Sequence, residues 1–227
     1  MRVNFLFLIA FLIFVSCDNS QAPGPAAAPN YSPSGAPAEP TSEGCAEGFY
    51  YEEQKACNGK VYPDPATSPY ILPFFEGRTF RTGLSNCSSS FHSPGTPDAL
   101  AFDFDMPVGE KFIAARDGIV VGVENSKPSG GGGSGNWVAV EHRDGTVAYY
   151  LHSPEGGVIV AVGQEVQQGQ VLGVTGMSGL AGYPHLHFIV VEGPGTWPYE
   201  GVPVSFNNVV PNDVVLESYK EYGACEN

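Results

Sequence analysis

Basic residues are scarce in this chain of 227 residues. Ten lysines and arginines stand against 24 aspartates and glutamates, which gives a formal net charge of -14. A strongly negative surface repels phosphate backbones and anionic lipid headgroups. The composition therefore argues against nucleic acids and anionic membrane surfaces as partners, although it says little about chemistry.

Long apolar runs are scarce as well. Residues 1–16, MRVNFLFLIAFLIFVS, hold one basic residue and then an apolar run too short to span a bilayer comfortably. Because this run is short and low-complexity sequence follows it, we interpret these residues as a signal peptide rather than a retained single-pass anchor.

The end of this signal resembles the lipobox of bacterial lipoproteins. Residues 14–17 read FVSC, which predicts a lipid on Cys17, with cleavage by an ordinary signal peptidase as the alternative. The protein would then be exported and held at the cell envelope, on the inner or outer membrane, by its lipid anchor alone.

Cysteine is rare, and no Cys-x-x-Cys pair is present. Apart from Cys17, the chain has Cys45, Cys57, Cys87 and Cys225, so a zinc site built from cysteines lacks its usual spacing. An even number of cysteines in an exported chain predicts two disulfides, for which three pairings exist. We favour Cys45 with Cys57, a short local loop, and Cys87 with Cys225.

Residues 18–43 are dominated by Pro, Ala, Ser and Gly and lack apolar periodicity, which is typical of a disordered tether. We therefore divide the chain into four parts: a signal peptide (1–16), a lipidated cysteine with its tether (17–43), an extension held by a disulfide (44–70), and one globular domain with a carboxyl-terminal tail (71–227). The last part is long enough to form a sizeable core.

Helical periodicity is absent from the rest of the chain. Short runs rich in Val, Ile, Phe and Tyr alternate with Gly, Asn and Asp turns, which predicts an all-β fold. Asp144 and Gly145 mark the turn of a hairpin, and the glycine-rich residues 129–135 form a loop between two strands. We expect an antiparallel sheet, barrel-like or sandwich-like, with long loops framing a groove.

Histidine is also rare, with five in the chain. In a strand, side chains two positions apart share a face, so His185 and His187 of the segment YPHLHF would look into one space. Asp103 lies between Phe102 and Phe104, and its carboxylate should point away from both rings. No His-Glu-x-x-His motif supplies a glutamate base.

The order of several segments resembles one known family. They are DFDMPVG (103–109), AARDGIV (114–120), GNWVAVEH (135–142), AYYLH (148–152), VGQEVQQGQVLGVTGMSG (162–179) and PHLHF (184–188). Together they resemble the lysostaphin-type, or LytM-type, zinc metallopeptidases, which cut peptidoglycan cross-bridges. The resemblance covers roughly residues 70–192 and implies a LytM-type peptidase fold with one Zn²⁺ per chain.

The resemblance also implies roles for individual residues. It makes Asp103 and His187 metal ligands, and it places His152 and His185 beside the water on the metal as catalytic groups. The family's usual first ligand, a histidine four residues before the aspartate, is Ala99 here. A branch of the family has this histidine further upstream, and residues 89–104 resemble that branch, with His92 as the ligand and Asp98 as a weaker substitute.

Other residues receive lesser roles. Tyr150, two positions before His152, would share its face in a regular strand and bind substrate, or else be a core aromatic. We interpret His142 as structural, Asn136 as a turn residue, and Asp105 as solvated or adjacent to the ligands.

Three functions compete. The first is a monomeric zinc endopeptidase that hydrolyses stem or cross-bridge peptides of peptidoglycan, with zinc-bound water as nucleophile and two histidines for acid–base and oxyanion work. The second is a degenerate relative that binds and activates a wall hydrolase. The third, a biotinyl or lipoyl carrier suggested by residues 162–173, fails because no lysine lies between Lys127 and Lys220.

Overall fold

A computed structural model describes residues 51–193 and 197–225. The predicted signal peptide, the lipid site at Cys17, the tether and Cys45 lie outside these residues. Across the described ranges, no helix has both the length and the apolar character needed to cross a membrane.

Strands make up almost all of the regular structure. They are β1 (Thr79–Leu84), β2 (Phe102–Phe104), β3 (Lys111–Ile113), β4 (Gly118–Glu124), β5 (Asn136–Glu141), β6 (Thr146–Ser153), β7 (Glu165–Val166), β8 (Val171–Val174), β9 (Leu186–Glu192), β10 (Val209–Val210) and β11 (Glu221–Ala224). Two short 3-10 helices, η1 (Pro65–Thr67) and η2 (Ser90–His92), complete the list. The predicted all-β class is confirmed.

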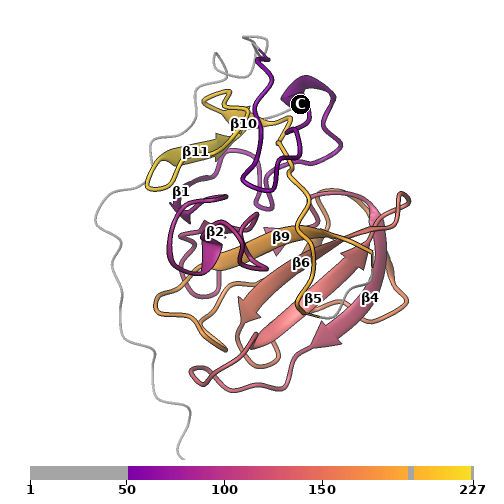
Figure 1. The fold of residues 1–227 in the computed structure, drawn as a ribbon. Coiled ribbons are helices and arrows are strands. Elements are labelled where there is room, and N and C mark those ends of the chain that lie inside the picture. Colours follow the sequence, from indigo (N-terminus) through magenta and orange to yellow (C-terminus); the bar gives the residue numbers. More distant parts are fainter. Residues whose placement is uncertain (1–50, 194–196, 226–227) are drawn as a thin grey trace, which may run out of the picture. The chain divides into compact units, whose positions relative to one another are not determined.

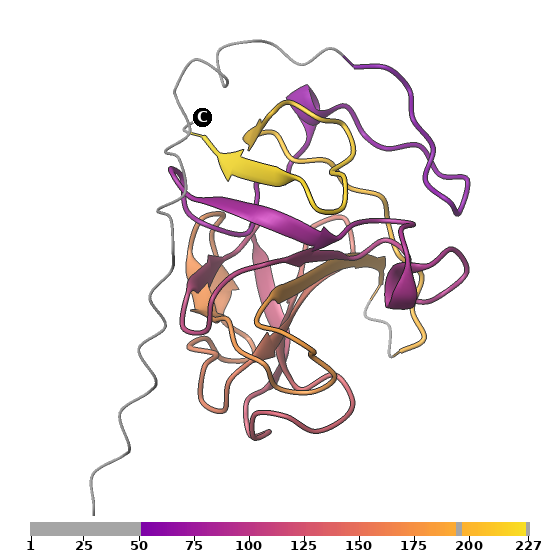
Figure 2. The same cartoon turned by 90° about the vertical axis from the view of Figure 1, so that its left-hand side faces the viewer.

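Nine strands form one sheet in the order β10-β11-β1-β2-β9-β6-β5-β4-β7, and β3 pairs with β8 in a second, two-stranded sheet. Every strand pair is antiparallel, as predicted. Figure 1 shows β2, β9, β6, β5 and β4 side by side. The turned view in Figure 2 shows β11 lying along β1, so the carboxyl-terminal strand extends this sheet.

The predicted hairpin joins β5 to β6. The His142 N–H donates to the Thr146 carbonyl at 2.8 Å and closes the turn. The Asp144 carboxylate accepts from the Thr146 N–H at 3.1 Å and orders the loop from within. Gly145 has a φ of 83°, which a residue with a side chain rarely adopts, so glycine suits the turn.

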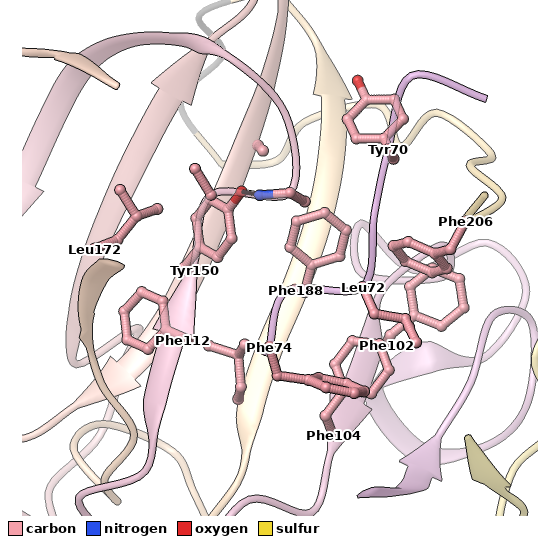
Figure 3. Close-up of a cluster of buried hydrophobic side chains, with 14 of the residues drawn as sticks. Tyr70, Leu72, Phe74, Phe102, Phe104, Phe112, Tyr150, Leu172, Phe188 and Phe206 are labelled. Carbon is pink, nitrogen blue, oxygen red and sulfur yellow. Dashed lines mark hydrogen bonds between the residues drawn. The ribbon is translucent and has the colours of Figure 1, made fainter. Parts of the chain in front are cut away.

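Both faces of the central strands are buried. One face carries the aromatic core in Figure 3, where the Tyr150 and Phe188 rings pack between Phe112 and Phe102. The opposite face carries a smaller cluster that includes Ile189. A strand covered on both sides reads as a continuous apolar run, which explains the sequence LHFIVVE of β9. His187, within this run, and His185, immediately before it, are both buried.

Cys57 and Cys87 form a disulfide with a Cα–Cα distance of 5.8 Å, so the pairing favoured from the sequence is wrong. Tertiary contacts bring these two cysteines together. The turn that carries Cys57 folds back, with a bridge between Lys55 and Val61, and Ala56 packs against Leu100 beside Cys87. Cys225, next to the end of β11, is also disulfide-bonded.

Removing the Cys57–Cys87 disulfide should destabilise the fold. Replacing both cysteines by serine frees a loop spanning 30 residues, and we expect the free energy of unfolding to fall by about 2–5 kcal/mol. Urea unfolding of the folded domain measures the change. Ser88→Ala is the matched control, because its hydroxyl makes one bond to the Ser85 carbonyl and its loss should cost about 1 kcal/mol. A double variant as stable as the wild type would contradict the expectation.

Candidate metal centre

The site begins at the register between β2 and β9. Asp103 pairs directly with His187, as Phe102 does with Phe188 and Phe104 with Leu186. The phenylalanines enter the core, and the aspartate and histidine point to the other side. The predicted orientation of Asp103, opposite to its two aromatic neighbours, is therefore what the strand produces. Asp103 Oδ1 lies 2.8 Å from His187 Nδ1.

His185 immediately precedes β9 and belongs to the same cluster. Its Nδ1–H donates to the Tyr183 carbonyl at 2.8 Å, and its Nε2 lies 3.6 Å from Asp103 Oδ1. The carbonyl bond holds the ring so that Nε2 looks into the cluster. The expectation that His185 and His187 share one space fits this geometry.

His152 reaches the same space through an irregularity in β6. Asn136 pairs with Ser153 and Trp137 pairs with Leu151, so His152 is the extra residue of a β-bulge. Its φ of 75° lies in the left-handed region. The bulge turns the His152 ring toward His185, with ring centroids 4.7 Å apart.

The same bulge explains why Tyr150 does not fit its predicted role in substrate binding. In a regular strand Tyr150 and His152 would share a face, but here they point to opposite sides. Tyr150 is fully buried in the aromatic core, stacks on Phe112 and accepts a hydrogen bond from the Ala115 N–H at 2.8 Å (Figure 3). Tyr150 is a core residue, the alternative that the sequence also allowed.

His92 comes from a loop rather than from a strand. It ends η2 and is 1% exposed. Its Nδ1–H donates to the Ser85 carbonyl at 3.3 Å, and its Nε2 lies 3.3 Å from Asp103 Oδ1. The histidine displaced from position 99 therefore reaches the cluster.

The loop that carries His92 is held at its start. The Asn86 side-chain amide donates to the Ala101 carbonyl at 3.0 Å, and the Cys87 N–H donates to the Ala99 carbonyl at 2.6 Å. The disulfide from Cys87 adds a covalent restraint. Position 99 thus supports the displaced histidine through its backbone.

Two overlapping groups of side chains could hold a metal ion. One contains His92, Asp103 and His187, and the other contains His152, His185 and His187; within each, the donor atoms lie within 4.8 Å of one another. All five side chains are buried. The structure therefore brings together the five residues predicted as ligands and catalytic groups.

The carboxylate of Asp103 dominates the electrostatics. Burial alone raises the pKa of this carboxyl, but hydrogen bonds from His187 and His92 outweigh burial and hold the pKa well below its usual range. Burial likewise lowers the pKa of His187, while Asp103 and Asp98 raise it, with a net pKa of about 9. In the metal-free chain at neutral pH, Asp103 and His187 are thus a buried ion pair.

The two remaining histidines behave differently. Burial, together with the charges of His187 and His185, lowers the pKa of His152 to about 3. Burial also lowers the pKa of His185, although Asp103 opposes the shift. Both rings are therefore neutral at neutral pH, and a neutral imidazole with one N–H held by a carbonyl presents the other nitrogen as an acceptor.

Sequence reasoning missed the residue that fixes His152. The Ser178 carbonyl accepts from His152 Nδ1–H at 2.9 Å, and the Ser178 hydroxyl donates to the Ser153 carbonyl and accepts from the Asn136 N–H. Ser178 lies in the segment TGMSG, which Gly135 approaches closely: a Cβ on Gly135 would lie 2.5 Å from the Ser178 carbonyl carbon. The sequence of that segment does not indicate that Ser178 binds a histidine.

Three further residues singled out from the sequence belong to neither group of possible metal ligands. His142 donates from Nδ1 to the Asp117 carbonyl at 2.8 Å and packs edge-on against Tyr70. Asp105 pairs with Arg81 at 2.6 Å. Asn136, expected in a turn, begins β5 and bonds Lys127 through both side-chain amide atoms.

The donor chemistry of the cluster fits zinc. Two imidazole nitrogens and one carboxylate oxygen are a donor set of catalytic zinc sites, which keep a further position open. Histidines that bind metals usually donate their other ring N–H to a carbonyl or a carboxylate, as His92 does to Ser85. His92, Asp103 and His187 supply this donor set, and His92 also has its second ring nitrogen bonded to a carbonyl.

Comparisons with known proteins identify a family and individual proteins to which this chain is similar. Residues 99–198 match the model of Peptidase family M23. "Peptidoglycan DD-endopeptidase ShyA" of Vibrio cholerae is 35% identical over 92 residues, which are 40% of this chain and 20% of that protein. "Peptidoglycan DD-endopeptidase ShyC" of the same organism is 36% identical over 86 residues, 38% of this chain and 18% of that protein.

Among solved structures, lysostaphin from Staphylococcus simulans is 22% identical, with a TM-score of 0.46 over 60% of this chain and 52% of that chain. This chain spans about a fifth of the length of the two Vibrio cholerae relatives. The matched residues include Asp103, His152, His185 and His187, whereas His92 precedes them. Residues 99–198 are therefore a domain of peptidase family M23.

Proposed function

We propose that this protein is a zinc-dependent endopeptidase that hydrolyses peptide bonds in the stem or cross-bridge peptides of peptidoglycan. The observation that carries the proposal is the complete cluster of four histidines and one aspartate, of which all but His92 lie within the residues matched by the M23 family model. The printed names of the Vibrio cholerae relatives support the substrate class.

Of the two possible ligand groups, we assign the metal to His92, Asp103 and His187. This group contains the carboxylate, which partly neutralises a divalent cation in a buried site. It also leaves His152 and His185, both neutral, free for proton transfer. When bound, Zn²⁺ polarises carbonyl oxygens and lowers the pKa of a coordinated water to about 7.

The chain's own residues then supply the acid–base chemistry. His152 is oriented by the Ser178 carbonyl and His185 by the Tyr183 carbonyl, so each presents Nε2 toward the shared space. One ring accepts a proton from water at its Nε2, and the imidazolium so formed supplies that proton to the leaving amine, directly or through the second ring. Burial excludes bulk water and strengthens these interactions.

The proposed location of the protein rests on the sequence of residues 1–17. We propose export under the direction of residues 1–16 and attachment to the envelope through a lipid on Cys17, with peptidoglycan peptides as the substrate and no nucleic acid partner. An acidic chain is not drawn to anionic wall polymers, so tethering would raise its local concentration instead.

A second function, binding and activating a wall hydrolase without catalysis, has one observation in its favour. Ala99 occupies the position where the family usually has its first histidine ligand. Metal binding by His92 would favour the endopeptidase, and its absence would favour the activator.

Single substitutions should separate ligands from catalytic groups. His92→Ala should lose zinc, because it removes one of three donors, whereas His152→Ala should keep about one zinc per chain and lose at least about 100-fold in hydrolysis, since general acid–base groups contribute 10²–10⁴-fold. Zinc content by mass spectrometry and new free amino groups from purified peptidoglycan measure the two effects.

His142→Gln is the control for these substitutions, because it alters a buried histidine outside the cluster while keeping a donor for the Asp117 carbonyl. It should keep both zinc and activity. Loss of zinc from His152→Ala together with retention in a folded His92→Ala would assign the metal to the three-histidine group. A folded, zinc-free wild type without cleavage would favour the activator function.

The metal-free protein should contain one histidine that stays protonated up to about pH 9. The pKa of His187 is raised to about 9, so the ion pair with Asp103 stabilises the metal-free fold below that pH and is lost as the pH rises through it. Nitrogen-15 NMR of the imidazoles follows the titration, and His187→Gln identifies the resonance. Asp103→Asn should lower this pKa toward the ordinary value. If every imidazole titrated below pH 7 in the wild type, the ion pair would be excluded.

Adding Zn²⁺ at pH 7 tests the connection to function, because a metal on His187 must displace a proton from this ring. The titration near pH 9 should then disappear in the wild type and persist in His92→Ala, which has lost a donor. Its persistence in zinc-loaded wild-type protein would mean that His187 is not a ligand.

A further inference from the structure

The imidazole of His187 faces a carboxylate on each edge. Nδ1 lies 2.8 Å from Asp103 Oδ1, and Nε2 lies 3.6 Å from Asp98 Oδ1. The two aspartates thus approach opposite ring nitrogens. Asp98 had been considered from the sequence as a substitute ligand, but it belongs to neither group of side chains that could hold a metal.

Asp98 is itself fixed by a second side chain. The Tyr199 hydroxyl donates to Asp98 Oδ1 at 2.7 Å. The Tyr199 ring stacks on Tyr149, with centroids 5.6 Å apart and an interplanar angle of 21°. Tyr149 belongs to β6 and pairs with Ile189 of β9, the strand that carries His187. The tyrosine hydroxyl is therefore built onto the sheet that holds the metal site.

The backbone around Asp98 is ordered as well. The Asp98 carbonyl accepts from the Ala101 N–H at 2.9 Å, just before β2 begins. Asp98 and Tyr199 lie immediately outside the two ends of the residues matched by the M23 family model, 99–198. The pair is thus a feature of this chain that the family match does not supply.

We propose that Asp98, held by Tyr199, is a positioning residue for His187: its carboxylate, 3.6 Å from Nε2, favours a proton on that nitrogen and thereby presents Nδ1 to the metal. The inference rests on the proposed metal site. A ring nitrogen can bind a metal only with its lone pair, so fixing the proton on Nε2 selects the tautomer that coordinates through Nδ1, beside Asp103. The Asp98 charge also makes Nδ1 a stronger donor.

The arrangement explains how one histidine can lie beside two carboxylates. With metal bound, Asp103 and His187 would both hold the ion, and Asp98 would remain as the carboxylate partner of the far nitrogen. Loss of such a partner typically weakens metal binding by 10–100-fold without removing a ligand.

The test is the affinity of the purified, folded protein for Zn²⁺, measured by competition with a chromophoric chelator. We compare wild type, Asp98→Asn, Tyr199→Phe and His187→Ala. Asp98→Asn should bind one Zn²⁺ at saturation about 10–100-fold more weakly. Tyr199→Phe keeps the ring stack and removes one hydroxyl, so it should show a smaller loss in the same direction. His187→Ala should lose the site.

Glu200→Gln is the matched control, because it removes one negative charge next to Tyr199 from a side chain that pairs with Lys60. It should bind Zn²⁺ as the wild type does. Thermal unfolding of each metal-free variant reports folding, and Tyr199→Phe carries the test if Asp98→Asn does not fold.

Each result has a distinct meaning. Wild-type affinity in both Asp98→Asn and Tyr199→Phe overturns the positioning role while leaving the metal site intact. A folded Asp98→Asn that binds no Zn²⁺ even at saturation, as expected for His187→Ala, makes Asp98 a ligand and also overturns it. Wild-type protein that binds no Zn²⁺ overturns the proposed function and this inference together.

Discussion

The contact between Asp103 and His187 is the interaction on which the site depends. It is set by the pairing of β2 with β9, two strands buried on both faces, so the phenylalanine core and the carboxylate–imidazole pair are consequences of one register. A shift of one residue would send both polar groups into the core and the aromatic rings outward. Burying a charge pair is costly, and leaving either partner alone would cost several kcal/mol more.

This constraint makes fold and chemistry inseparable at the cluster. Every other member is placed by reference to the pair: His92 and His185 both direct Nε2 at Asp103 Oδ1, and the His152 ring lies 5.7 Å from that of His187. Burial, assisted by the charge of His187, keeps His152 neutral, whereas Asp103 and Asp98 hold the proton of His187, so adjacent imidazoles differ widely in pKa. A metal ion and a proton then compete for the His187 ring. The proton stabilises the buried Asp103 charge in the metal-free site, and a metal ion would displace it on binding.

Much of this could be predicted from the sequence, for physical reasons. The alternation of a strand places His185 with His187 and turns Asp103 away from its flanking phenylalanines, and both expectations fit the structure. The antiparallel all-β class and the hairpin at Asp144 and Gly145 follow from equally local rules, and both are confirmed.

Other features depend on contacts between distant segments and leave no local signal. The bulge at His152 is one extra residue in an otherwise regular strand, and it reverses the face on which Tyr150 was expected. The Cys57–Cys87 bond depends on the fold of the amino-terminal extension, which spacing does not reveal. Ser178 acts through its backbone carbonyl, and Tyr199 is placed by stacking on Tyr149. Neither contact can be predicted from the type of residue.

The displaced ligand brings these two kinds of information together. A histidine at position 99 would be held by its closeness to β2, whereas His92 must be brought back across a loop whose entropy opposes a defined position. The chain meets this demand with restraints on residues 85–87: hydrogen bonds from Ser85 to Ser218 and from Asn86 to Ala101, and the disulfide at Cys87. These restraints link the amino-terminal extension, the carboxyl-terminal segment and β2 to one loop. Moving a ligand out of a strand therefore transfers the work of positioning it from local register to the tertiary structure around it.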